Sequence, residues 1–310
     1  MTGVEALDSI EVTLSAGSRI GLTLGLAIMI FSVALTLKPD DFVFLAKRPK
    51  MFFGGLATQI LGLPLMTLGL AHLISPPASV AFGMIVVACC PGGNVSNLMV
   101  LMSRGNAAYS VSLTAASNAL AFIITPFAIL GWAALYPPTA DLIRAIEIET
   151  LPFILQTAMA LGVPLAIGML LSTFQPGIAK RIQPIFYVLA IAILVGLVTI
   201  GLISNWELIM NSGDVIAPVA ILHNALAFAL GAVAGLALRL ESKSRRALTF
   251  EIGIQNAGLG LVILLTQFPT LGGAAAVTGF WSIWHLFAGI GLALAFRFYD
   301  HLRKTDGVKT

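Results

Sequence analysis

The sequence predicts a polytopic, all-α membrane protein, and its composition and hydropathy are the main reasons. Of its 310 residues, 58% are hydrophobic and only 10% are charged, and the mean hydropathy is +0.97. Soluble domains carry roughly 25% charged residues, so this chain has too few charges to keep a folded surface in water. The composition therefore excludes a soluble globular protein, a disordered chain and a secreted disulfide scaffold. It favours helices that satisfy their own backbone in a bilayer.

Apolar stretches of roughly 20 residues, the length that crosses a bilayer as a helix, recur along the chain. We expect nine transmembrane helices, at 20–37, 51–74, 78–103, 107–135, 150–173, 183–203, 215–238, 247–267 and 271–296. Residues 1–19 would form an extracytoplasmic N-terminal segment and residues 298–310 a cytoplasmic tail. The adjacent Cys89 and Cys90 are interpreted as packing residues.

The basic residues test this arrangement. When the loops are assigned alternately to the two sides, 15 of the 17 Lys and Arg residues fall on one side, and only Arg19 and Arg144 on the other. Cytoplasmic loops carry an excess of basic residues, so the N-terminus is predicted outside and the C-terminus inside. The net charge of +3 is interpreted as this loop bias and not as a sign of nucleic-acid binding.

Two of the nine spans contain helix-breaking residues near their middle. In 78–103, Pro91-Gly92-Gly93 is followed at once by the polar Asn94, Ser96 and Asn97. In 247–267, glycines flank the polar cluster that runs from Glu251 to Asn256. Proline removes a backbone donor and glycine favours non-helical backbone, so each helix is expected to break and to face protein, water or a ligand. A kinked structural helix is the alternative for either span alone.

The two interrupted spans are five apart, and repeats of five helices would be inverted relative to each other in the membrane. Two such repeats need ten spans, so the first repeat is expected to lack its opening helix, and spans one to four pair with spans six to nine. Interrupted helices at equivalent positions of inverted repeats indicate a binding site at the midplane of a secondary transporter.

Broken helices expose free N–H groups that suit an anion and free carbonyls that suit a cation. Ser96, Asn97 and Gln255 add neutral oxygen ligands, and Glu251 adds the charge, a combination that suits sodium better than a soft metal. Alternatively, Glu251 is a helix-end residue paired with Arg245 or Arg246.

Further polar residues lie in the neighbouring spans. Ser110 and Thr114 are four residues apart, so their hydroxyls share one helix face and are candidate cation ligands, although single hydroxyls usually bond to their own helix. Gln59 is an isolated amide whose alternative role is an interhelix hydrogen bond. For His223 and His285, a packed hydrogen-bonding role is weighed against contact with a substrate.

Two motifs are specific, ACCPGGNVSN at 88–97 and FEIGIQNAG at 250–258. Supporting stretches are LTLKPDDF at 35–42, RGN at 104–106, LHN at 222–224 and WSIWH at 281–285. From about residue 20 to 297 the chain resembles the bacterial bile acid:sodium symporter family. One departure is Asn94-Val95, where many bacterial members have Thr-Ala.

The resemblance implies two inverted five-helix repeats that form a panel domain and a core domain, with two crossing discontinuous helices in the core. Here the panel would comprise 20–38 and 150–203, and the core 51–136 and 215–297. It also implies two sodium ions. The first would bind Ser96, Asn97, Ser110, Thr114 and Glu251; the second would bind Gln59, Glu251, Gln255 and the carbonyls of Ile252 and Ile254. Substrate would contact Asn94, Asn256 and His285.

The predicted function is therefore sodium-coupled import of an organic anion, a bile acid or similar carboxylate, through the bacterial inner membrane. Its partners would be that small anion and the lipid bilayer. The first alternative is a transporter of the same fold that is proton-coupled or uncoupled. The second is an intramembrane enzyme using Glu251, His223 and His285, but the chain contains neither a G-x-S-x-G nor an H-E-x-x-H motif.

Overall fold

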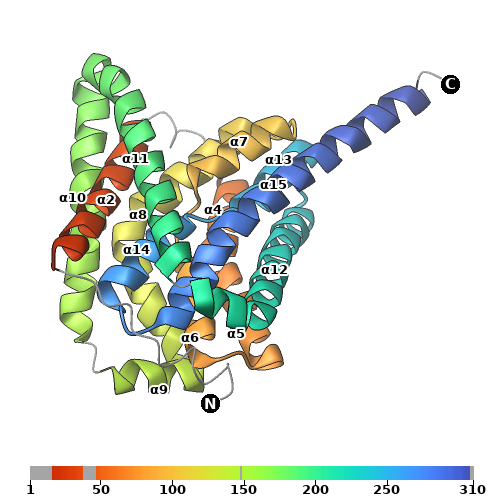
Figure 1. Ribbon diagram of the computed structural model, residues 1–310. Helices are drawn as coiled ribbons and strands as arrows, with labels where there is room; N and C mark the ends of the chain where they lie inside the picture. Colours follow the sequence, from red (N-terminus) through yellow and green to blue (C-terminus); the bar gives the residue numbers. More distant parts are fainter. Residues whose placement is uncertain (1–15, 38–46, 147–148, 205, 308–310) are drawn as a thin grey trace.

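We describe the protein from a computed structural model, which covers residues 16–37, 47–146, 149–204 and 206–307. Within these ranges the fold is helical, with one isolated β-bridge between Gly92 and Gln255 (Figure 1). Its helices are α2 (Ala16–Ala34), α4 (Pro49–Ala57), the π-helical turn η2 (Thr58–Gly62), α5 (Leu63–Ile74), α6 (Ala78–Cys89), α7 (Asn94–Met102), α8 (Ala107–Ala134), α9 (Pro137–Ala145), α10 (Thr150–Phe174), α11 (Pro176–Ser204), α12 (Trp206–Ala237), α13 (Ser242–Gly253), α14 (Ala257–Gln267) and α15 (Gly272–Gly307).

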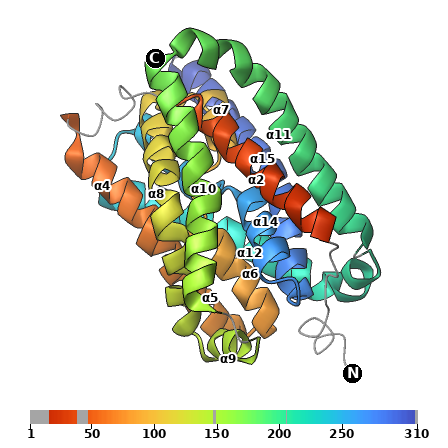
Figure 2. The same cartoon turned by 90° about the vertical axis from the view of Figure 1, so that its left-hand side faces the viewer.

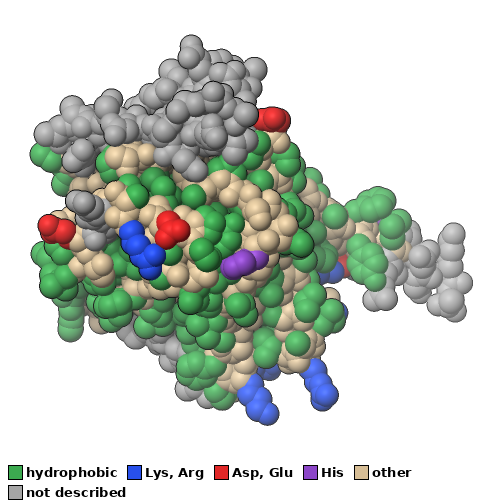
Figure 3. Space-filling model, turned by 90° about the horizontal axis from the view of Figure 1, so that it is seen from below, with side chains coloured by type: hydrophobic (Ala, Val, Ile, Leu, Met, Phe, Trp, Pro, Cys, Tyr) green, Lys and Arg blue, Asp and Glu red, His purple; other side chains and the backbone are tan. Residues whose placement is uncertain are grey.

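Several of these helices have the dimensions of membrane spans. In the described part of the chain, five are long and apolar enough to cross a bilayer, namely 49–74, 107–134, 150–174, 213–237 and 272–302. Residues 20–34, α6 and α14 are shorter apolar helices. Figure 3 views the end that carries α9 and shows hydrophobic side chains over much of the described surface, with few charged ones. The prediction of a polytopic helical membrane protein is confirmed.

Both predicted interruptions are confirmed. Span 78–103 is divided into α6 and α7, with residues 90–93 outside any helix, and span 247–267 is divided into α13 and α14 by residues 254–256. The second broken helix begins earlier than predicted, at Ser242.

The described helices pack around three hydrophobic clusters, and the two largest link the broken helices to their neighbours. One cluster joins α2 and α10 to α6, α8 and α14, where the Phe268 ring lies 4.8 Å from Phe82 and 5.2 Å from Phe153 between centroids. The other joins α4, α7, α8, α12, α13 and α15, and includes Phe228 and Phe250. Figure 2 shows α10, α2 and α11 together on one side of the molecule, where they contact one another.

Several features differ from the predicted helices. Helices α11 and α12 begin earlier than predicted, at Pro176 and Trp206 instead of 183 and 215. The segment 137–145, expected as a loop, forms the short helix α9, which begins at two prolines that suit a first helical turn. Helix α15 continues to Gly307, through most of the predicted cytoplasmic tail. In the second span, η2 interrupts the α-helix where Gln59 lies, and such π-turns are frequent at functional sites. Most of the predicted N-terminal segment, the loop 38–46 and residues 308–310 lie outside the described residues.

Candidate functional site

The two breaks meet through their backbones. Gly92 pairs with Gln255 in the antiparallel β-bridge, the N–H of Asn256 donates to the carbonyl of Pro91 at 2.9 Å, and the N–H of Gly93 donates to the carbonyl of Ile254 at 3.4 Å. Glycine permits this approach, because a Cβ at Gly92 would lie 3.0 Å from Glu251 Oε2 and 3.2 Å from Gln59 Nε2. Two helix interruptions that are about 160 residues apart in the chain therefore form one junction.

Glu251 is the charged group of this junction and is 0% exposed. Its carboxylate accepts hydrogen bonds from three hydroxyls: Ser96, Ser110 at 2.5 Å and Thr114 at 2.8 Å. Asn97 joins the same cluster, because its Oδ1 lies 2.7 Å from Ser110 Oγ and 3.4 Å from Thr114 Oγ1. All five residues of the first predicted sodium site are thus brought together.

These contacts contain more acceptors than hydrogens. Ser96 Oγ also lies 2.8 Å from the carbonyl of Gly93, so the three hydroxyls make six contacts at hydrogen-bond distance with four acceptor oxygens. Each hydroxyl has one hydrogen to donate. Half of these close oxygen–oxygen contacts are therefore left without a proton, and a small cation would satisfy them.

The alternative role of Glu251, pairing with a nearby arginine, is wrong. Arg246 pairs with Asp300 on α15, with Nη2 2.5 Å from Oδ1, and no described ion pair includes Glu251 or Arg245. A buried carboxylate without a cationic partner is costly, and the three hydroxyl hydrogen bonds offset only part of that cost.

The residues of the second predicted sodium site also meet beside Gly92. Gln59 Nε2 donates to Gln255 Oε1 at 3.3 Å, which is the interhelix bond given as its alternative role. Gln59 is 2% exposed, and its Oε1 has no hydrogen-bond partner among the described residues. Such an orphaned buried oxygen fits a cation ligand. The carbonyls of Ile252 and Ile254 accept from Gln255 Nε2 at 2.9 Å and from Gly93 N–H.

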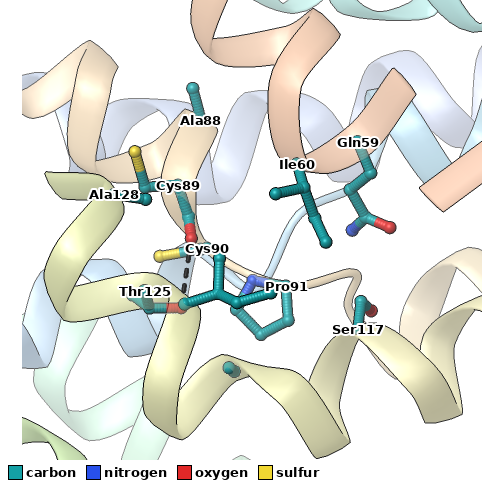
Figure 4. Close-up of a pocket in the computed structure, with 11 residues that line it drawn as sticks. Gln59, Ile60, Ala88, Cys89, Cys90, Pro91, Ser117, Thr125 and Ala128 are labelled. Carbon is teal, nitrogen blue, oxygen red and sulfur yellow. Dashed lines mark hydrogen bonds between the residues drawn. The ribbon is translucent and has the colours of Figure 1, made fainter. Parts of the chain in front are cut away.

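Figure 4 shows Gln59 reaching from η2 toward the first break, with Pro91 and Ser117 across a narrow cavity of about 20 Å³. That volume is enough for one water molecule. The same view shows Thr125 donating to the carbonyl of Cys89 at the end of α6, at 3.1 Å. Cys89 and Cys90 are free and buried, as packing residues are.

Four further polar residues hold the breaks, and sequence reasoning missed their role. Ser117 accepts from the N–H of Gly92 at 3.2 Å, and Asn118 donates to the carbonyls of Gly92 at 2.9 Å and Thr114 at 2.8 Å. Asn224 donates to the carbonyl of Gly253 at 2.8 Å. The residues are Ser117, Asn118, Thr125 and Asn224. For two of them the sequence did contain a signal: Ser117 and Asn118 lie one helical turn after Thr114 on α8, so they extend the same polar face.

All three predicted substrate residues line one cavity of about 380 Å³ beside the junction. Asn94 and Asn256 lie at the starts of α7 and α14, and His285 lies on α15. The opposite wall consists of α2 and α11 residues, among them Ser32 and Tyr187. No charged side chain occurs among the described residues that line this cavity.

The two deep histidines have different surroundings. His285 stacks on Trp281, with ring centroids 4.7 Å apart, and its Nδ1 lies 2.8 Å from the carbonyl of Trp281. Because a carbonyl can only accept, Nδ1 carries the proton and Nε2 is left as an acceptor. His223 does not line the described cavity, and its Nε2 bonds to Thr67 Oγ1 at 2.8 Å, which favours the packing role.

This geometry agrees with the comparison with known proteins. Residues 23–212 match the sequence model of the Sodium Bile acid symporter family. The chain belongs to this family. Membership makes it a sodium-dependent membrane transporter and not an enzyme, so the intramembrane-enzyme alternative is wrong.

Three relatives illustrate the breadth of this symporter family. The chain is 34% identical over 275 residues to YocS of Bacillus subtilis, which is named as an uncharacterised sodium-dependent transporter. The aligned residues make up 88% of this chain and 81% of YocS. It is 29% identical to the probable chloroplastic sodium/metabolite cotransporter BASS1 of Arabidopsis thaliana, over 79% of this chain and 59% of BASS1. It is 26% identical to the human ileal sodium/bile acid cotransporter, over 80% of this chain and 69% of that protein.

Proposed function

We propose that this protein is a secondary active symporter that imports a small organic anion, a bile acid or similar carboxylate, together with two sodium ions. The observation that carries the proposal is Glu251, a fully buried carboxylate that lies where two broken helices meet. It has three hydroxyl contacts and no cationic partner among the described residues. A sodium ion supplies the positive charge that the side chains around it do not. We further propose nine spans in inverted repeats, with the N-terminus outside and the C-terminus in the bacterial cytoplasm.

The two proposed sodium sites share Glu251. The first comprises Ser96, Asn97, Ser110 and Thr114 with Glu251, and is supported by the shortage of protons among these oxygens. The second comprises Gln59, Gln255 and the carbonyls of Ile252 and Ile254 with Glu251, and is supported by the unpartnered Gln59 Oε1. One carboxylate among neutral oxygens suits a monovalent hard cation.

The proposed anion site is the cavity that Asn94, Asn256 and His285 line. Helices α7 and α14 both begin at its wall, so their free N–H groups and positive dipole ends favour a negative ligand there. With no Lys or Arg among the described lining residues, these helix ends supply the positive potential. A cavity of about 380 Å³ is within the usual range for small-molecule sites.

Coupling would follow from this shared junction. Sodium bound to α7 and α13 orders the breaks, and the same breaks form the wall of the anion cavity, so each ligand raises the affinity for the other. We propose that α2, α10 and α11 form the panel, and that the core, which carries both breaks, moves against it to give alternating access.

A proton in place of sodium is the alternative, since Glu251 could be protonated. The six neutral side-chain ligands argue against it, because a proton needs none of them, and the unpartnered Gln59 oxygen would be unexplained.

The test begins with a thermal-shift screen of organic acids on the purified protein, with sodium chloride or potassium chloride at equal ionic strength. Ligands that bind only the folded state raise its melting temperature. We expect acids that stabilise the protein only in sodium, and uptake of these acids into proteoliposomes driven by an inward sodium gradient. Uptake that is unchanged when potassium replaces sodium, or that follows a pH jump in sodium-free buffer, would refute sodium coupling.

A further inference from the structure

Arg246 is a buried arginine near the end of the molecule that carries the start of α13, and none of the proposed sites uses it. Its guanidinium binds Asp300 on α15 with both arms, Nη1 to Oδ2 at 2.7 Å and Nη2 to Oδ1 at 2.5 Å. It also lies 4.8 Å from the centre of the Phe296 ring. Two parallel charge-assisted hydrogen bonds and a ring contact fix the orientation of the guanidinium.

The remaining contact of Arg246 reaches the other broken helix. Its Nη1 donates to the carbonyl of Ser103 at 2.7 Å. Ser103 is the residue that ends α7, where helix carbonyls lack intrahelical partners and carry partial negative charge. One side chain thus joins α13, α7 and α15, which Figure 1 shows gathered beside one another and which contact one another.

This contact is a second point of attachment between two of the helices that carry the first proposed sodium site. Helix α7 carries Ser96 and Asn97, and α13 carries Glu251. At one end the two helices are joined through the backbone of the breaks, where Gly93 N–H donates to Ile254. At the other end Arg246 joins them through Ser103. The ligand oxygens lie between these two attachments, so the position of α7 relative to Glu251 is set at both ends.

We propose that Arg246 is a positioning residue for sodium binding, which acts by holding the end of α7 against α13. This inference rests on the proposed function. A partner that orients a ligand from outside typically contributes 10- to 100-fold in metal affinity. For Arg246, which is more remote, we expect the lower end of that range.

The experiment is a sodium titration of the purified full-length protein in detergent, with sodium chloride replacing potassium chloride at constant ionic strength. The melting temperature gives two readouts, its value in potassium alone and the sodium concentration that produces half of the rise. For Arg246→Gln we expect half-saturation at about tenfold more sodium. Arg246→Lys keeps one charge-assisted donor, and we expect about threefold.

Arg245→Gln is the matched control. It removes the same charge from the neighbouring position of α13, where the arginine is half-buried and makes no described ion pair, so sodium half-saturation should stay at the wild-type value. The double variant Arg246→Asp with Asp300→Arg separates the contact with Asp300 from the contact with Ser103. It keeps an ion pair between α13 and α15, but residue 246 then presents an anion to the Ser103 carbonyl. Sodium half-saturation should remain impaired in the exchanged protein.

A merely structural role would lower the melting temperature in potassium but leave sodium half-saturation unchanged, and that result for Arg246→Gln would overturn the inference. If Arg246→Gln does not fold, Arg246→Lys decides, because it keeps the charge but replaces the guanidinium that binds Ser103 and Asp300 together; a wild-type half-saturation in Arg246→Lys would equally overturn the inference. A wild-type protein whose melting temperature does not respond to sodium would instead refute the proposed function.

Discussion

The two breaks meet at one junction, but their freed backbone groups find partners in different ways. At the first break, side chains of the neighbouring helix α8 bind the carbonyl of Cys89 and both polar groups of Gly92. At the second break, Asn224 of α12 donates to the carbonyl of Gly253. The carbonyls of Glu251 and Ile252 instead accept from Gln255 Nε2, at 3.2 and 2.9 Å. Gln255 belongs to that break itself.

The two breaks therefore differ in how they are held and in what they contribute to the junction. The first break is held by side chains of α8, and it leads into α7, which carries the proposed neutral ligands Ser96 and Asn97. The second carries the charge, and rotation of the Gln255 amide alone frees the Ile252 carbonyl for a cation. A cation can therefore change the second break without disturbing the helices that hold the first. The following substitutions test this contrast, from the largest expected effect to the smallest.

Removing the charge of the second break should have the largest effect. In Glu251→Gln, sodium should no longer raise the melting temperature, and sodium-dependent uptake should fall by at least about 100-fold, the loss expected when a buried charge loses its partner. In sodium-free buffer the same variant should melt at a higher temperature than the wild type, because the buried unpaired carboxylate is gone.

Ser96→Ala is the counterpart at the first break. It removes one neutral ligand, so we expect sodium half-saturation to rise by about tenfold, equivalent to about 1.4 kcal/mol, with maximal uptake retained. Equal losses in Ser96→Ala and Glu251→Gln would contradict the separation of charge from neutral ligands.

Next come the residues that hold the breaks. Asn118→Leu removes two hydrogen bonds: it leaves the buried carbonyl of Gly92 without its donor, while that of Thr114 keeps Ser117. Asn224→Leu removes one hydrogen bond and leaves the carbonyl of Gly253 without its donor. An unsatisfied buried group costs about 1–3 kcal/mol, and each further lost hydrogen bond adds about 0.5–1.5 kcal/mol. Thermal or denaturant unfolding in detergent should therefore show a larger loss of stability for Asn118→Leu. The reverse order would mean that the second break depends more on its neighbours than the first.

Gln59→Met tests the second sodium site alone. The substitution keeps the volume of the side chain and removes the unpartnered oxygen. It also removes the 3.3 Å hydrogen bond to Gln255, so unfolding should show a loss of about 1 kcal/mol. If two ions bind, the sodium dependence of uptake should lose its cooperativity, with a Hill coefficient falling from above one to about one. A sigmoidal sodium dependence identical to that of the wild type would exclude Gln59 as a ligand.

Ser117→Ala should have the smallest effect. It removes the acceptor of the Gly92 N–H, at a cost of about 1 kcal/mol in unfolding free energy, while the carbonyl of Gly92 keeps Asn118. Sodium half-saturation should shift less than in Ser96→Ala. A shift as large as that variant's would mean that the first break is less firmly held than its hydrogen bonds suggest.

Much of this site could be predicted from local chemistry. Pro91-Gly92-Gly93 breaks a helix wherever it occurs, and a lone carboxylate such as Glu251 in an apolar segment requires an explanation. What the sequence did not reveal depends on contacts between distant segments. The pairing of Arg246 with Asp300 rather than with Glu251, and the bond from Asn224 to Gly253, follow from how α12, α13 and α15 pack. The turn η2 at Gln59 ends at Gly62, two residues before Pro64, and these two residues were a local signal that sequence reasoning missed.

The short antiparallel ladder between the breaks has a consequence for how such transporters diversify. Gly92 with Gln255, Gly93 with Ile254, and Pro91 with Asn256 are joined by main-chain atoms, which substitution does not remove. In the proposed function Asn94 and Asn256 contact the substrate, so substitution of these side chains would change the substrate preference while the main-chain contacts between the two breaks persist. Substrate selectivity and sodium coupling would then evolve independently, so one fold could transport a new substrate while it keeps its sodium sites.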